Sequence, residues 1–272
     1  MIGRMLETRV VEKPWGVDLL PPPFVDCEGR RIGEIWFEPP PEMPKLLVKY
    51  LFTSETLSVQ VHPSDEEAPA GNRGKDECWL ILAAEPGARI ATGFKDSVSR
   101  SAMRTAALDG SIEHLLQWHE VQSDDFVYLP AGTVHAIGAG ISLIEVQQNS
   151  DITYRLYDYG RPRELHLEQG IAIADGGPHP PGLRRHLPMG GAISLVDGPY
   201  FRLDRLQGVP DARLVERYAD APLLVIPLDA PARLGELTIE PGGCAVTESL
   251  SALKMHEEGR ALIAQQIERD KS

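Results

Sequence analysis

The middle of the chain alternates between short apolar runs and tight turns. Apolar runs at 126–129, 135–137 and 141–147 are separated by a Pro-Ala-Gly turn at 130–132 and by Gly-Ala-Gly at 138–140. Short runs rich in β-branched and aromatic residues and bounded by glycine and proline are typical of strands joined by tight turns. The rhythm predicts a small β-barrel or jelly roll in this part of the chain.

Further strands are predicted upstream, and one of them carries polar residues on one face. The run at 57–62 alternates, so that Ser58, Gln60 and His62 project to the same side. Strands are also expected at 33–37, 46–51 and 77–82. Between 97 and 119, Ala, Met, Leu and Ile recur at roughly helical spacing after serine caps, which predicts a small helical insertion.

The second half reads as a separate, smaller unit. Residues 176–188 are rich in Gly, Pro, His and Arg with little periodicity, which is typical of a linker. Beyond it, short strands are predicted at 192–196, 201–206, 223–227, 237–239 and 244–247, followed by a short helix or tail near the end. We therefore expect two domains, at 1–178 and 188–272, in a fold that is all-β apart from small helical insertions.

Charge and cysteine usage narrow the possible environments. A net charge of −13 over 272 residues disfavours nucleic acid and anionic membranes, and an anionic ligand would need a local basic pocket. The charged N-terminus is unlike a secretory signal, and no apolar run reaches the ~20 residues of a membrane span. Cys27, Cys78 and Cys244 lack metal-like spacing and predict reduced, packed thiols. These features predict a soluble cytoplasmic protein.

One set of side chains has the composition of a metal site. Gln60 and His62, two apart on a strand, could hold one ion, although such a pair alone is more often a solvated face. Glu77 and His135 are candidate partners from elsewhere in the chain. Two imidazoles, one carboxylate and one amide oxygen suit zinc or a similar divalent ion better than calcium or magnesium.

The turn that precedes His135 resembles a known motif. Pro130-x-Gly132-x-x-His135 is similar to the second sequence motif of cupins, in which the turn delivers a histidine into the barrel. The glycine that usually opens this motif is Asp124 here, and the usual final asparagine is Ala139. The resemblance implies a cupin or jelly-roll barrel followed by a degenerate, cupin-like β domain without metal, which would serve packing or dimerisation.

Five ordered strings between about residue 13 and residue 175 resemble the short bacterial form of type I, zinc-dependent mannose-6-phosphate isomerases. The strings are Lys13-Pro14-Trp15-Gly16, Ser58-Val59-Gln60-Val61-His62-Pro63, Gly74-Lys75-Asp76-Glu77-Cys78-Trp79, Pro130-Ala131-Gly132-Thr133-Val134-His135-Ala136 and Gln148-Asn149-Ser150-Asp151-Ile152-Thr153-Tyr154-Arg155-Leu156-Tyr157-Asp158. Five motifs in the same order make this resemblance specific. It does not extend into the second half of the chain.

This resemblance implies roles for individual residues. Gln60, His62, Glu77 and His135 match the zinc ligands, with one Zn²⁺ per chain. Arg155 matches an arginine needed for turnover, Glu145 an acidic residue ten positions before it, and Lys75 a lysine that orients substrate or assists proton movement. The expected phosphate contacts are Ser58, Arg161 and Lys49, with Arg163 as a spare.

The implied activity is the interconversion of mannose 6-phosphate and fructose 6-phosphate through a cis-enediol. The base that removes the carbon-bound proton remains open between Glu145, Lys75, a metal ligand and zinc-bound water. Alternative functions are a cupin isomerase for another phosphosugar, a metal-dependent dioxygenase, or a sugar-phosphate-binding protein without catalysis. A monomer and a homodimer are both compatible with the sequence.

Overall fold

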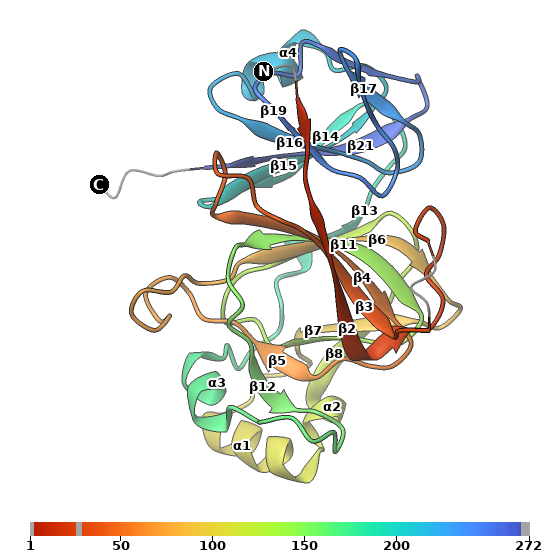
Figure 1. Cartoon of the computed structure of the whole chain (residues 1–272). Coiled ribbons are helices and arrows are strands. Elements are labelled where there is room, and N and C mark those ends of the chain that lie inside the picture. The colour runs from red at the N-terminus through yellow and green to blue at the C-terminus, as the bar shows by residue number, and fades with distance from the viewer. Residues whose placement is uncertain (1–2, 26–28, 268–272) are drawn as a thin grey trace.

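The computed structural model describes residues 3–25 and 29–267, so Cys27 lies outside the described residues. Within them the strands form four antiparallel sheets, two in each half of the chain, with a few short helices (Figure 1). The predicted all-β fold with small helical insertions is confirmed. Each of the described helices is too short to cross a membrane.

The first half forms a barrel from two sheets. One sheet has the order β13-β9-β6-β11-β4-β3-β2, with bounds Arg184–His186, Asp125–Leu129, Glu77–Ala84, Ile141–Gln148, Leu46–Thr53, Ile32–Phe37 and Thr8–Val17. The other has the order β12-β5-β10-β7-β8, with bounds Tyr154–Tyr157, Val59–Val61, His135–Ile137, Arg89–Phe94 and Leu116–Glu120. Apolar side chains such as Trp79, Ile81 and Leu143 fill one part of the interior between the sheets.

Helices cover the outer face of the second sheet. α1 (Arg100–Asp109), α2 (Ile112–Leu115) and α3 (Leu167–Ile173) pack on it through an apolar cluster that includes Val61, Met103 and Ile171. The Ser99 side chain caps α1 by accepting a hydrogen bond from the Ala102 N–H. The helical prediction for 97–119 is wrong at its end, because residues 116–119 belong to β8 and pair with β7.

The second half is built on a six-stranded sheet and a three-stranded sheet. The larger has the order β1-β19-β16-β21-β15-β14, with bounds Arg4–Met5, Ala245–Thr247, Leu223–Pro227, Arg260–Gln266, Phe201–Gln207 and Ala192–Asp197. The smaller contains β18 (Leu237–Ile239), β17 (Ala232–Leu234) and β20 (Leu253–Met255), and the remaining elements are η1 (Pro181–Leu183) and α4 (Ala212–Arg217). The helix expected near the end is wrong within the described residues, because β21 is an interior strand between β15 and β16; residues 268–272, where a tail was the alternative, lie outside the described residues.

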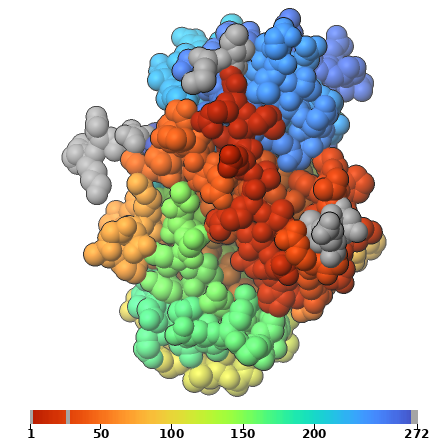
Figure 2. Space-filling model, in the orientation of Figure 1, coloured from red at the N-terminus to blue at the C-terminus, as the bar shows by residue number. Residues whose placement is uncertain are grey.

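A continuous apolar core joins the two halves. Outward-facing residues of the first barrel, such as Tyr50 and Val146, pack in one cluster with Phe201 and Leu262 of the second half. In the space-filling view the blue second half lies directly against the red and orange strands (Figure 2). The chain also crosses between the halves, because β1 at the N-terminus pairs with β19. Part of the expected linker is ordered as β13, which pairs with β9.

Asp124, the residue that replaces the usual cupin glycine, connects the two halves electrostatically. Its φ is 68°, in the left-handed region that favours glycine. Its carboxylate accepts two hydrogen bonds from Arg260 Nη1, at 2.6 and 2.7 Å, and lies 4.0 Å from Nη1 of the fully buried Arg205. The ion pair therefore links the turn before β9 to β21.

We expect Asp124→Asn to lower the free energy of unfolding by about 1–3 kcal/mol, because the buried Arg205 loses the carboxylate that lies 4.0 Å from it and Arg260 keeps only that of Asp229. Asparagine tolerates the left-handed backbone, so the loss would report the ion pair and not backbone strain. Thermal unfolding should show the loss, with Asp96→Asn on an exposed turn as the control. Equal stability of both variants would contradict this role for Asp124.

Candidate metal centre and substrate cavity

Three strands bring the predicted metal ligands together. His62 directly follows β5, Glu77 is the first residue of β6, and His135 is the first residue of β10. His135 pairs in register with Gln60 of the neighbouring strand. The turn before β10 is tied to the same place, because the Gly132 N–H donates to the His62 carbonyl at 2.8 Å. Gly132 has a φ of 86°, which explains the glycine of the motif.

Hydrogen bonds from the imidazoles leave their Nε2 atoms available as ligands. His62 Nδ1 lies 2.8 Å from the Ile152 carbonyl oxygen, and His135 Nδ1 lies 2.9 Å from that of Thr133. A carbonyl oxygen only accepts hydrogen bonds, so each Nδ1 carries the proton and each Nε2 keeps its lone pair. Burial lowers the pKa of both rings, that of His135 to about 3. Both imidazoles are therefore neutral near pH 7, the form that binds metal.

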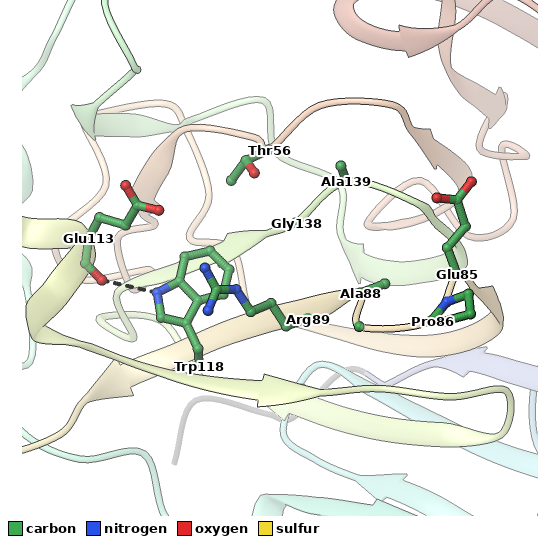
Figure 3. A pocket seen from close by; sticks show the side chains of 10 residues that line it. Thr56, Glu85, Pro86, Ala88, Arg89, Glu113, Trp118, Gly138 and Ala139 are labelled. Carbon is green, nitrogen blue, oxygen red and sulfur yellow. Dashed lines mark hydrogen bonds between the residues drawn. The ribbon is translucent and has the colours of Figure 1, made fainter.

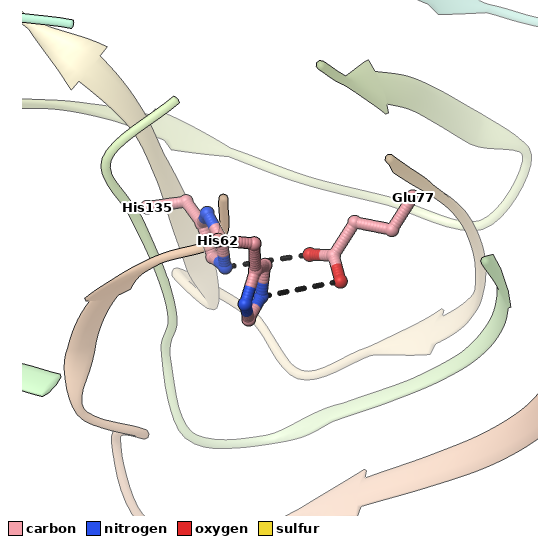
Figure 4. Close-up of side chains that lie close together, drawn as sticks. All are labelled: His62, Glu77 and His135. Atoms are coloured by element: carbon pink, nitrogen blue, oxygen red, sulfur yellow. Dashed lines mark ion pairs between the residues drawn. The ribbon is translucent and has the colours of Figure 1, made fainter. Parts of the chain in front are cut away.

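The Glu77 carboxylate faces these two lone pairs (Figure 4). Oε2 lies 3.4 Å from His62 Nε2, and Oε1 lies 3.3 Å from His135 Nε2. Burial opposes the charge of Glu77, but the Lys75 ammonium, 2.9 Å from Oε2, holds its pKa well below the usual range. Neither carboxylate oxygen accepts a well-aligned hydrogen bond from the described part of the chain.

This geometry fits a divalent cation. Zinc ligands at about 2.0–2.2 Å from the ion lie about 3.4 Å from one another in a tetrahedron, close to the spacings around Glu77. An anionic carboxylate and two lone pairs converge here, and the Lys75 ammonium beside Glu77 and His62 supplies the positive charge that a bound cation would add to. Gln60 lies beside this group, with its Nε2 3.2 Å from His135 Nε2 and its Oε1 accepting a hydrogen bond from Ser58 Oγ at 3.1 Å.

A cavity of about 300 Å³ opens beside His62, Glu77 and His135, since its lining includes Gln60 and Lys75, which lie against them. The predicted residues Ser58, Gln60, Lys49, Lys75, Glu145, Arg155 and Arg163 all line it. Cationic side chains in the lining outnumber acidic ones by six to three, in a protein whose overall charge is −13. This is the local basic pocket that an anionic ligand of an acidic protein requires.

Glu145 lies in the wall of this cavity between two lysines. Its Oε1 is 3.2 Å from Lys49 Nζ and 3.9 Å from Lys75 Nζ, and its Oε2 accepts a hydrogen bond from Trp79 Nε1 at 3.0 Å. Lys75 also reaches Glu77 and lies 3.2 Å from His62 Nε2. Lys75 therefore connects the metal ligands to the carboxylate of Glu145.

The three predicted arginines have different surroundings. Arg155 lines the cavity, and within the described ranges no carboxylate oxygen lies within 4.0 Å of its guanidinium; burial and then the nearby charge of Arg163 lower its pKa. Arg163 also lines the cavity, while two of its nitrogens donate to Asp158 at 2.6 Å. Arg161 does not line it, because its guanidinium donates to Asp158 and, at 2.6 Å, to the Thr56 carbonyl.

Sequence reasoning did not assign several residues of this cavity. The Trp79 indole donates a hydrogen bond to Glu145, and Glu34 and Trp36 of β3 line the cavity two strands away from Glu145 in the same sheet. Glu34 is the single acidic residue in the strand Ile32–Phe37, a signal that could have identified it. A second pocket, of about 270 Å³, is lined by Arg89, Trp118 and others and contains none of the predicted site residues (Figure 3).

The two-sheet barrel and its His-Glu-His group define a protein of the cupin class with a candidate metal centre. No family model matches the chain. It is 40% identical over 172 residues to a mannose-6-phosphate isomerase of Streptococcus mutans, a stretch that covers 60% of this chain and 54% of that protein. The aligned part thus spans about half the length of this relative.

Solved structures extend the likeness in fold to nearly the whole chain. The mannose 6-phosphate isomerase from Bacillus subtilis matches with a TM-score of 0.77 at 23% identity, covering 97% of this chain and 99% of that one. A zinc-bound mannose 6-phosphate isomerase matches with a TM-score of 0.72 at 14% identity, covering 98% and 100%. The chain is therefore similar in sequence to about half of a mannose-6-phosphate isomerase, and similar in fold to the whole of two others.

Proposed function

We propose that the chain interconverts mannose 6-phosphate and fructose 6-phosphate. The observation that carries the proposal is a metal-ligand group beside a basic cavity whose lining contains a buried carboxylate, Glu145, and an arginine, Arg155, without a carboxylate partner among the described residues. These three elements can serve an aldose–ketose isomerisation, because a base must move a proton between neighbouring carbons while a metal ion and a cation stabilise the negative charge that develops on oxygen. The similarity to known isomerases supports the same reaction.

His62, Glu77 and His135 would hold one zinc ion, with Gln60 as a fourth ligand. An amide binds metal through oxygen, so Gln60 would need a half turn of its amide to present Oε1 instead of Nε2. When bound, zinc supplies Lewis acidity to the substrate oxygens. The Nδ1 hydrogen bonds to backbone carbonyls hold both imidazoles in the orientation that ligation requires.

Glu145 is the proposed base for the carbon-bound proton. It lies in the cavity wall, and the lysines on its Oε1 and the indole on its Oε2 hold its carboxylate in place. Lys75 lies between Glu145 and Glu77, where its ammonium can orient the substrate oxygens. Arg155 would stabilise the enediolate, because an unpaired guanidinium remains free to contact a developing oxyanion.

The decisive assay combines zinc-loaded protein with mannose 6-phosphate and follows the formation of fructose 6-phosphate, with and without a chelator. We expect turnover that the chelator abolishes and added zinc restores. Turnover with a different phosphosugar would identify another cupin isomerase. Binding of mannose 6-phosphate without turnover would identify a sugar-phosphate-binding protein. Metal-dependent consumption of oxygen would identify a dioxygenase.

The phosphate would be bound by Ser58 and Arg163, which line the cavity, with Lys49 as a further contact. We expect Arg163→Ala to raise KM about 10-fold or more with little change in kcat, because the phosphate carries the same charge throughout the reaction. Arg161→Ala, at the neighbouring arginine outside the cavity, should raise KM less. Steady-state kinetics of both variants provide the comparison. A larger effect at Arg161 would place the phosphate contact there instead.

A further inference from the structure

Charged side chains of alternating sign cross the inner wall of the barrel from its mouth to the metal ligands. The series runs over neighbouring strands and ends at the first residue of β6. Lys13 Nζ lies 3.3 Å from Glu34, Lys49 lies 3.2 Å from Glu145, and Lys75 lies 2.9 Å from Glu77. The members are Lys13, Glu34, Lys49, Glu145, Lys75 and Glu77.

Glu34 occupies the outer part of this series and has no role in the function proposed above. Its side chain is 9% exposed, and its Oε2 accepts a hydrogen bond from Trp36 Nε1 at 2.6 Å in addition to the contact with Lys13. Burial opposes its ionisation, but the charges of Lys49 and Lys13 outweigh burial and lower its pKa. Glu34 is therefore an anion in the wall of the cavity.

Lys49 lies between Glu34 and the proposed base. It is 5% exposed, pairs in register with both Trp36 of β3 and Glu145 of β11, and lies 4.3 Å from the centre of the Trp36 ring. The ring that contacts the ammonium of Lys49 is thus held by its own hydrogen bond to Glu34. Lys49 therefore contacts the Glu145 carboxylate and the Trp36 ring directly, and Glu34 acts on it through charge and through its hydrogen bond to that ring.

We propose that Glu34 is a positioning residue, which together with the Trp36 ring sets how closely Lys49 approaches Glu145 and so how far the Glu145 carboxylate stays available to the substrate. This inference rests on the proposed isomerase function. Without the charge of Glu34, we expect Lys49 to move closer than its present 3.2 Å to Glu145 Oε1 and to compete more strongly for the oxygen that must accept the proton. Anion binding would not weaken, because the change removes a negative charge from the cavity.

The test is Glu34→Gln in the zinc-loaded protein, compared with wild type and with Glu12→Gln, the same change at an exposed site on the adjacent strand β2. The glutamine oxygen can still accept the Trp36 hydrogen bond, so the charge alone is lost. We expect kcat to fall roughly 10-fold through misplacement of a catalytic group, with KM unchanged or lowered. The zinc content and Tm of both variants should match those of wild type. The kinetics of Glu12→Gln should also match wild type.

A conservative variant separates positioning from general loosening. Glu34→Asp keeps the charge at a shorter reach, and its kcat should lie between those of wild type and Glu34→Gln. If Glu34→Gln does not fold, a lowered kcat with unchanged KM in Glu34→Asp still supports the proposal, and an unchanged kcat overturns it. A raised KM with lost zinc, or wild-type kcat in Glu34→Gln, also overturns it. No turnover by the wild type would instead refute the isomerase function.

Discussion

Replacing His135 with alanine is expected to remove bound zinc and to lower isomerase turnover by about 1,000-fold or more. Its Nε2 faces Glu77 at 3.3 Å, and its Nδ1 is already engaged by a backbone carbonyl. Loss of one ligand leaves the zinc ion weakly held. Lewis-acid assistance by the ion supplies several kcal/mol of transition-state stabilisation, and each ~1.4 kcal/mol corresponds to a tenfold change in rate. Metal analysis of the purified variant and a steady-state assay provide the two measurements.

The control for this experiment is His119→Ala in β8, a half-exposed histidine of the same sheet that belongs to no candidate metal group in the described part of the chain. It should retain about one zinc per chain and normal turnover. His62→Ala should behave like His135→Ala, because the two imidazoles contact the same carboxylate. Full zinc content in either ligand variant would show that the ion binds elsewhere.

Replacing Arg155 with alanine is expected to lower kcat by about 100-fold while zinc content and fold remain intact. A preorganised cation at a developing oxyanion is typically worth about 3 kcal/mol. Arg155 is suited to this role because it lines the cavity and its guanidinium has no carboxylate within 4.0 Å among the described residues. KM should change far less than kcat, since the negative charge on the sugar oxygen exists chiefly in the transition state.

Arg104→Ala is the matched control, because Arg104 is an exposed arginine of α1 paired with Glu168 outside the cavity. It should leave both constants unchanged. The comparison with Arg163→Ala is the more informative one, since that variant should change KM and leave kcat nearly constant. If Arg155→Ala and Arg163→Ala change the same kinetic constant, the assignment of Arg155 to the oxyanion and of Arg163 to the phosphate is wrong.

Local patterns determined the elements that carry the site. Alternation along 57–62 predicts that Gln60 and His62 share a face, and Pro130-x-Gly132-x-x-His135 predicts a tight turn into the barrel. The structure contains both, because strand alternation and the left-handed conformation of glycine are properties of a few consecutive residues. Elements whose form depends on distant neighbours were predicted less well.

The strand β21 shows that dependence. Ala261, Leu262 and Gln265 are residue types with good helix propensity, and a helix or tail was expected there. In the structure this segment lies between β15 and β16, with Leu262 in the core between the two halves and Ile263 in the core of the second half. Burial of both faces outweighs a propensity difference of a few tenths of a kcal/mol per residue.

The sequence by itself determined the strand pattern, the turn into the barrel and the residue types of the metal site. Tertiary structure alone decided which arginine reaches the cavity, because Arg161 and Arg163 are two residues apart and differ only in the partners that the folded chain offers them. It also decided the place of Glu34, whose neighbours Lys13 and Lys49 come from flanking strands. Contacts between side chains distant in sequence follow from strand pairing and packing, which no local pattern encodes.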